Sequence, residues 1–197
     1  PVHSPVFFLA RERALAQEAV AGDILGIPNH GALRIGDTLT EGEALSFTGV
    51  PSFAPEILMR VRLDDPMRAK HLSRALKELA EEGVSHLFRP LTGGSAIVGV
   101  VGPLQFEVIQ ARIAAEYKIK CGFEPAPFEY ARWIKSDDRA ALDRIQREHA
   151  SSLALDQDGA PVFLFRNSWE LGRIQKDWPA LRFLATREQF EVEPVAG

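Results

Sequence analysis

From residue 55 onward the hydrophobic positions change repeatedly between the two-residue period of a strand and the 3.6-residue period of a helix. Strands are predicted at residues 57–63, 84–89, 96–101, 119–123, 130–135, 153–155, 162–165 and 182–186. Helices are predicted at residues 66–82, 103–117, 137–149 and 169–176. The order β-α-β-β-α-β therefore occurs twice. It is the order of the split βαβ motif, so we expect an α+β fold with two ferredoxin-like halves.

Acidic pairs stand where two predicted strands pass into helices, at Asp64-Asp65 and Asp137-Asp138. A carboxylate there accepts hydrogen bonds from the free N–H groups of the first helical turn and complements the helix dipole. We therefore interpret both pairs as capping residues rather than as a catalytic carboxylate dyad. Asp65 is the predicted cap of the first helix, and Ser136 or Asp137 is the predicted cap of the third.

The second predicted helix, residues 103–117, carries two apolar stripes instead of one. One stripe consists of Leu104, Val108, Ala111 and Ala115, and the other of Phe106, Ile109, Ile113 and Tyr117. A helix with two apolar faces is expected to be covered on two sides. We predict that it packs under its own sheet and against the neighbouring half, so that the two halves form one rigid unit.

The N-terminal part has shorter apolar runs separated by Gly-Asp, Asn-His-Gly and Gly-Asp-Thr turns. Strands are predicted at residues 6–10, 23–28 and 32–36. A sheet of so few strands has open edges, which the remaining strands of a barrel would close. Residues 41–55 are rich in Gly, Pro and Ser and are predicted to be a connector.

Composition places the chain among ordinary globular proteins. It has 197 residues, of which 46% are hydrophobic and 25% charged, and its net charge is −4. No apolar run approaches the roughly 20 residues of a membrane span. The single cysteine, Cys121, forms no internal disulfide, suits a reducing cytoplasm, and is expected to be a buried structural residue. Pro1 is not an initiator residue, so we expect the chain to be a piece of a longer polypeptide.

Several sequence features resemble a known family. The segment Ala21–Leu39 resembles the last strands of the second-domain β-barrel of translational GTPases. Further similarity lies in Phe47–Glu56, Glu81–Val84, Phe88–Pro90, Ile97–Val108, Arg112, Glu116-Tyr117 and Ala131–Trp133. In combination these motifs resemble the bacterial class II peptide chain release factors, the release factor three family, over nearly the whole chain.

The resemblance implies a domain organisation. Residues 1–50 would be the C-terminal strands of the barrel domain, and residues 51–188 the α/β C-terminal domain, followed by a tail at 189–197. Its two ferredoxin-like halves would span about 55–125 and 126–188. The family stimulates departure of class I release factors from the ribosome. The expected partners are the ribosome and the GTP-binding domain of the same protein, with no membrane; a monomer in the cytoplasm is expected.

Nucleotide-binding motifs are missing from the sequence. It contains no Gly-x-x-x-x-Gly-Lys-Ser/Thr phosphate loop and no Asn-Lys-x-Asp guanine-binding motif. Gly94 and Gly99 have the spacing of a phosphate loop, but Val100 and Val101 replace its Lys and Ser/Thr. The resemblance therefore assigns GTP, GDP and Mg²⁺ to another part of the protein. No catalytic, cofactor or metal residues are predicted; the five histidines (His3, His30, His71, His86 and His149) lack metal-site spacing.

Because the chain is acidic overall, contacts with ribosomal RNA would have to come from local basic patches. The candidates are Lys70, Arg74, Lys77, Arg89, Lys118 and Lys120. Glutamates near the first three (Glu78, Glu81 and Glu82) favour a solvated helix face there instead. Trp133, Trp169 and Trp178 are expected in the core rather than as base-stacking residues.

Two alternative functions stay open on the sequence. The chain could be a fragment of another translational GTPase, such as an elongation factor G relative, because the barrel segment fits both. It could instead be a small-molecule regulatory module, since tandem ferredoxin-like units often bind ligands between them.

Overall fold

The computed structural model describes residues 5–9, 12–28, 33, 36–43, 45 and 52–187. The chain divides into two compact units, Pro1–Leu45 and Ser46–Gly197, and each is described here by itself. His30, most of the strand predicted at 32–36 and the tail at 189–197 lie outside the described residues. The domain boundaries drawn from the sequence stay predictions.

The first unit contains a three-stranded antiparallel sheet of order β2-β1-β3. Its strands are β1 (Val6–Leu9), β2 (Glu12–Leu15) and β3 (Leu25–Gly26). The described residues close no barrel. The sequence analysis missed β2, because Glu-Arg-Ala-Leu has no β-branched or aromatic residue. Leu15, Val20 and Ile24 are 69%, 74% and 84% exposed.

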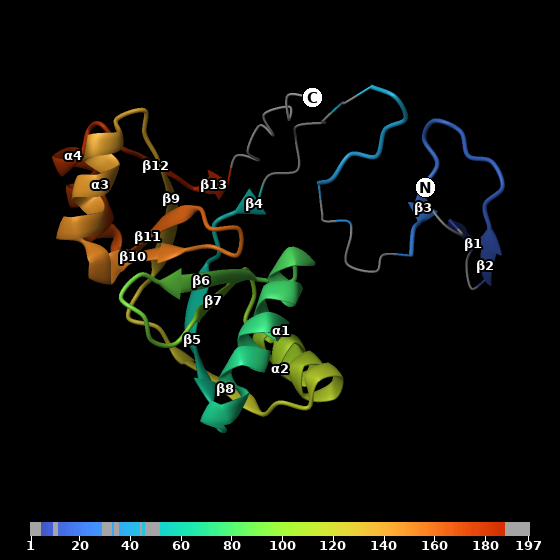
Figure 1. Cartoon of the computed structure of the whole chain (residues 1–197), viewed down its shortest axis with the longest axis horizontal. Helices are drawn as coiled ribbons and strands as arrows, with labels where there is room; N and C mark the ends of the chain where they lie inside the picture. The colour runs from blue at the N-terminus through green and yellow to red at the C-terminus, as the bar shows by residue number, and fades with distance from the viewer. Residues whose placement is uncertain are drawn as a thin grey trace. The chain divides into compact units, whose positions relative to one another are not determined.

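The second unit is built on an eight-stranded antiparallel sheet of order β12-β9-β11-β10-β6-β7-β5-β8 (Figure 1). Its strands are β5 (Ile57–Leu63), β6 (His86–Pro90), β7 (Ile97–Val100), β8 (Cys121–Pro125), β9 (Tyr130–Lys135), β10 (Leu153–Leu155), β11 (Pro161–Phe165) and β12 (Arg182–Leu184). Its helices are α1 (Ala69–Glu81), α2 (Leu104–Tyr117), α3 (Arg139–Glu148) and α4 (Ser168–Asp177). A separate two-stranded ladder joins β4 (Ser52–Phe53) to β13 (Thr186–Arg187).

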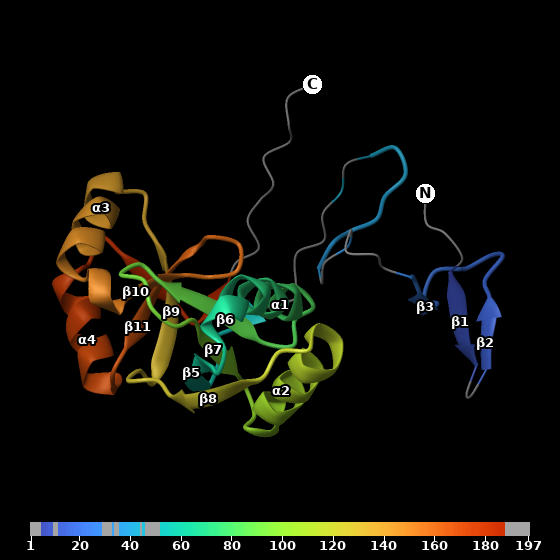
Figure 2. The same cartoon turned by 60° about the horizontal axis from the view of Figure 1, so that its bottom comes forward.

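Each half of this sheet has the same strand order. The spatial orders are β8-β5-β7-β6 and β12-β9-β11-β10. When the strands of each half are counted along the chain, both orders read fourth, first, third, second. This is the arrangement expected for a split βαβ motif. The halves join where β6 pairs with β10, through Pro90 opposite Ala154 and Arg89 opposite Leu155 (Figure 2). The predicted α+β class and the twofold β-α-β-β-α-β element order are confirmed.

Alternate residues of the strands enter different hydrophobic clusters. Leu87 belongs to the cluster under α1 and α2, and Phe163 belongs to the cluster under α3 and α4. Side chains of the opposite pleat, including Leu58 and Phe88 of the first half and Trp133 of the second, form a third cluster. The two halves therefore share one core on the sheet face that carries no helix.

Helix caps follow the predicted chemistry with one change. The Asp65 carboxylate accepts a hydrogen bond from Met67 N at 3.0 Å, as predicted, and a short 3₁₀ turn leads into α1. At α3 the cap is Asp138, whose carboxylate accepts from Ala141 N at 3.1 Å. The prediction of Ser136 or Asp137 is wrong by one or two residues, because β9 ends at Lys135 as predicted but α3 begins only at Arg139.

The packing predicted for α2 is wrong. Phe106 and Ile109 are buried as expected, but Leu104 and Val108 of the other stripe are 70% and 51% exposed. The helix packs on α1 and β8 within its own half. The halves are held together through the opposite face of the sheet instead, so the second stripe of α2 is not used between them.

Two of the three tryptophans are in the core, as predicted. Trp133 and Trp178 are 4% and 7% exposed. The prediction for Trp169 is wrong, because this residue lies in the first turn of α4 and is 72% exposed. The guanidinium of Arg173 lies over its ring, 5.6 Å from the ring centre.

Candidate functional site

Helix α1 carries three of the six basic residues proposed as contacts. Lys70 is exposed. The Arg74 Nε atom lies 2.7 Å from a carboxylate oxygen of Glu78, and Lys77 Nζ lies 3.6 Å from one of Glu81. Arg74 and Lys77 therefore sit in pairs four residues apart on their own helix, an arrangement typical of a solvated face.

A polar cluster ties α1 to α2 beside these residues. The Tyr117 hydroxyl donates to a Glu78 carboxylate oxygen at 2.5 Å, and Arg112 Nη1 lies 2.6 Å from Glu82. The bonds from Tyr117 and then Arg74 lower the pKa of Glu78. Burial, followed by the bond to Glu78, raises the pKa of Tyr117 to about 12. These contacts hold the helix pair together.

A second basic group lies where α1 begins and α2 ends. Arg68 Nη2 donates to the backbone oxygen of Lys118 at 3.1 Å. Lys118 ends α2 in the left-handed region with φ of 56°, and its Nζ donates to Ala115 O at 2.8 Å. Lys120 is exposed one residue before β8. The structure thus brings Arg68, which the sequence analysis did not select, beside Lys118.

Arg89 does not belong to either group. It lies on β6, and its Nη2 donates to the backbone oxygen of Asp156 at 3.1 Å. This contact spans the line where the two halves meet, because Arg89 pairs with Leu155 across the sheet. Arg89 therefore has a structural contact in the centre of the domain.

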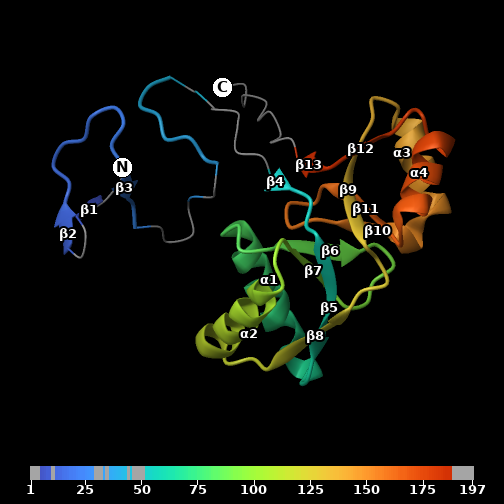
Figure 3. The ribbon, with the colours of Figure 1, turned by 180° about the vertical axis from the view of Figure 1, so that it is seen from behind.

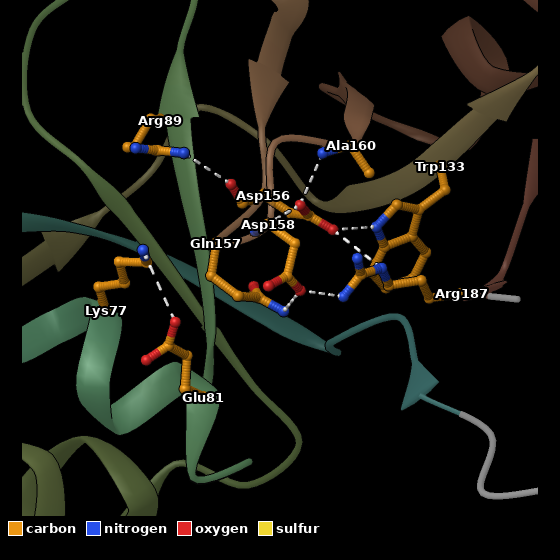
Figure 4. Close-up of polar contacts among 9 residues, drawn as sticks. All are labelled: Lys77, Glu81, Arg89, Trp133, Asp156, Gln157, Asp158, Ala160 and Arg187. Atoms are coloured by element: carbon orange, nitrogen blue, oxygen red, sulfur yellow. Dashed lines mark hydrogen bonds and ion pairs between the residues drawn. The ribbon is translucent and has the colours of Figure 1, made fainter. Parts of the chain in front are cut away.

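Asp156, whose backbone oxygen accepts the hydrogen bond from Arg89, has a buried carboxylate at the β10–β11 turn (Figure 4). Asp156 is fully buried. Its Oδ1 accepts hydrogen bonds from the backbone N of Asp158 at 2.9 Å and Ala160 at 2.8 Å. Its Oδ2 accepts from Trp133 Nε1 at 3.0 Å and lies 3.2 Å from Arg187 Nε. A buried charge is tolerated only when it is paired and hydrogen-bonded in this way.

Arg187 connects the buried carboxylate to the segment that leads into the domain. Its guanidinium also forms an ion pair with Asp158. On β13 it lies opposite Ser52 of β4, and the next backbone bond of this ladder runs from Ala54 N to Ala185 O at 2.7 Å. We call the ladder of β4 and β13 the strap.

A small cavity lies beneath the strap. Its volume is about 110 Å³, and it is lined by residues that include Ser52, Ser85, His86 and Gln157. Ser85 Oγ, His86 Nδ1 and Gln157 Oε1 are buried and have no hydrogen-bond partner among the residues that the structure describes. The polar wall of the cavity therefore comes from three places: the start of β6 with the residue before it, the β10–β11 turn, and the strap.

His86 is enclosed by aromatic rings. The ring of Phe88 stacks on it at 6.0 Å and that of Trp133 meets it edge-on at 5.6 Å. Burial lowers the pKa of His86, and a hydrogen bond with the backbone of Phe53 partly opposes this effect. The imidazole is therefore neutral in the folded protein near pH 7.

Other chemistry-bearing residues have structural roles. Cys121 is buried, as predicted, and burial raises the pKa of its thiol. Among the described residues, no cluster of three or more His, Cys, Asp or Glu side chains could hold a metal ion. No helix in the described part of the chain is both long and apolar enough to cross a bilayer. A cavity of about 410 Å³ is lined only by residues 57–123, within the first half.

The second unit is an α+β domain in which four helices accompany an eight-stranded antiparallel sheet. Residues 47–175 match the family model described as Class II release factor RF3, C-terminal domain. The chain belongs to this family, which confirms the family prediction and favours it over an elongation factor G relative. The matched region is the non-catalytic C-terminal domain of a GTPase.

Sequence reasoning missed the Asp156 site. Asp156 follows a short strand and precedes Asp158-Gly159, so the sequence presents it as an ordinary hairpin turn residue. Its partners Trp133 and Arg187 lie 23 and 31 positions away, counted from the residue numbers, and no motif connects them. An unusually polar turn between two apolar strands, Asp-Gln-Asp-Gly, was the one available signal.

Proposed function

We propose that this chain is the portion of a class II release factor that provides contacts with the ribosome and between domains during translation termination. The whole protein would stimulate departure of class I release factors from the ribosome in the cytoplasm. Binding and hydrolysis of GTP, with Mg²⁺, would belong to another domain. The observation that supports this role is the family match over residues 47–175, which spans most of the eight-stranded sheet.

Among the predicted contact residues, the structure favours one group over the others. Arg74, Lys77 and Arg89 already have partners within the domain. Lys70 and Lys120 are exposed and make no ion pair with any described residue. With Lys118 they form a basic group at the end of the helix pair, where phosphate contacts would not first require an ion pair to break.

Ribosome sedimentation tests this proposal. The purified chain is mixed with ribosomes carrying a stop codon and a class I release factor and is pelleted through sucrose. We expect co-sedimentation that weakens with added salt and is reduced at least about tenfold by Lys70→Glu, Lys118→Glu and Lys120→Glu together. In the matched control, glutamate replaces Arg144, Arg147 and Lys176, which lie on α3 and α4. Its net charge changes by the same amount.

Three experimental outcomes would contradict different parts of this proposal. Equal loss in both triple variants would mean that binding depends on net charge and not on the helix-pair end. The docking role would be contradicted if the unmodified chain does not pellet with ribosomes and also does not displace the full-length factor from them. GTP turnover by the chain above that of a boiled sample would contradict the assignment of hydrolysis to another domain.

A further inference from the structure

The strap is attached to the domain mainly by polar contacts. Its two strands contribute two residues each, and Phe53, its largest apolar side chain, is 61% exposed. Arg187 holds it through ion pairs with Asp156 and Asp158. By contrast, the neighbouring segment Ile57–Leu63 is part of the main sheet and contributes Leu58 and Val61 to the core.

The wall beneath the strap is also polar. Three buried atoms of residues lining the cavity have no partner in the described part of the chain: Ser85 Oγ, His86 Nδ1 and Gln157 Oε1. Buried polar atoms lose little when water reaches them, whereas apolar surface is costly to expose. Segments with few buried apolar contacts open at a much lower free energy than the whole domain.

Directly after β4, the chain is held firmly to the main sheet. Pro55 lies over Gly99 so closely that a Cβ added to Gly99 would come within 2.4 Å of Pro55 Cγ. Directly after it, Glu56 N donates to Val100 O at 3.0 Å and joins the main sheet. Any opening of the strap should therefore stop at Pro55.

From these observations we propose that the strap is a latch that opens while the eight-stranded sheet stays folded. Closed, it ties residues 52–54 to β13 and, through Arg187, to the buried Asp156. Open, it frees these three residues, which span roughly 10 Å at about 3.3–3.6 Å per extended residue. This inference does not depend on a ribosomal role.

Amide hydrogen exchange of the ¹⁵N-labelled chain, followed by NMR, tests the latch at single residues. Ala54 N–H is bonded to Ala185 of the strap, Glu56 N–H to Val100 and Val61 N–H to Ala96 of the main sheet. We expect Ala54 to exchange at least about 100-fold faster than Val61 in the unmodified chain, because it needs only local opening. Glu56 should stay within the protected group.

Variants then identify the anchor. Arg187→Ala should accelerate exchange at Ala54 by about a further tenfold relative to Val61, since the strap loses both of its ion pairs. Arg182→Ala, which changes an exposed arginine of β12, is the matched control and should alter neither rate.

A crosslink provides the opposite test, in case Arg187→Ala weakens the whole domain. Phe53 and Thr186 are opposite each other, and the Ala54–Ala185 bond makes theirs a non-hydrogen-bonded pair, the closer type. A disulfide between Phe53→Cys and Thr186→Cys should slow exchange at Ala54 to the rate of Val61. Equal rates at Ala54 and Val61 in the unmodified chain, or a rate at Ala54 that the disulfide leaves unchanged, would overturn the latch.

Discussion

At the scale of single residues, two glycines have opposite roles. Gly99 lies in β7, and a Cβ there would meet Pro55 Cγ at 2.4 Å and Leu58 Cδ2 at 3.1 Å. Gly172 lies in the middle of α4, and nothing stands within 4 Å of a Cβ there. The same substitution to alanine should therefore change stability in opposite directions.

We predict that Gly99→Ala lowers the free energy of unfolding by about 1–3 kcal/mol, because overpacked cores must shift backbone or side chains. Gly172→Ala should raise it by about 0.5–1 kcal/mol, because alanine loses less conformational entropy in a helix. Urea denaturation monitored by circular dichroism measures both values. A neutral Gly99→Ala variant would show that Pro55 moves away freely.

His86 gives the domain a pH dependence that the sequence did not indicate. Burial lowers its pKa from the ordinary value of 6.5. Below that value the unfolded chain binds a proton that the folded chain resists, so the free energy of unfolding decreases as pH falls. The decrease continues until the pH passes below the folded-state pKa and then stops.

The predicted variant is His86→Gln, which cannot gain this charge. Its free energy of unfolding should fall less between pH 7.5 and pH 5 than that of the unmodified chain, although it is less stable at pH 7.5. Urea titrations at both values give the double difference, in which the carboxylates common to both proteins cancel. Parallel pH dependence in the two proteins would exclude His86 as the source.

At the scale of elements, the start of α3 allows a sharp comparison. Asp138 accepts the hydrogen bond from Ala141 N, and Asp137 makes no capping bond. Asp138→Ala should therefore lower the free energy of unfolding by about 1 kcal/mol, the usual value of an N-cap, and Asp137→Ala by a few tenths at most. The measurement is thermal or urea unfolding of both variants, and the reverse ranking would place the cap at Asp137, one of the two residues that the sequence analysis predicted.

Sequence patterns predicted elements well where one physical signal was strong. The strands Ile57–Leu63 and Tyr130–Lys135 are short runs rich in apolar residues, and both appear with the predicted bounds. The extra stripe of α2 misled the prediction because Leu104 and Val108 have the pattern of buried residues yet are exposed. Periodicity identifies an apolar face but does not say whether anything covers it.

The candidate site was predictable only in part, and the reason is also physical. Lys70, Lys118 and Lys120 are visible in the sequence as charges, and the structure places all three on the surface. Which polar groups meet depends on tertiary distance, so the hydrogen bond from Arg89 to a backbone oxygen was not predictable. The Asp156 network assembles residues from β9, the β10–β11 turn and β13, and it exists only once the sheet is complete.

At the scale of the whole molecule, the second unit should fold as one body although its sequence repeats an element order. The cluster on the helix-free face takes Leu58, Phe88 and Ile97 from the first half and Trp133 and Leu164 from the second. The sheet is also continuous through the β6–β10 pairing. Neither half can bury this face alone, so separating them would expose a shared core.

Phe88→Ala tests this cooperativity, because Phe88 is fully buried at the line between the halves. We predict a loss of about 3–5 kcal/mol in the free energy of unfolding, as for other buried phenylalanines. The unfolding should remain a single transition. In calorimetry the measured enthalpy should equal the van't Hoff enthalpy, and hydrogen exchange should accelerate equally at Val61 of the first half and Phe163 of the second. If the variant instead unfolds in two steps, with one half keeping its protection, each half has a sufficient core under its own helices and the shared cluster only docks them.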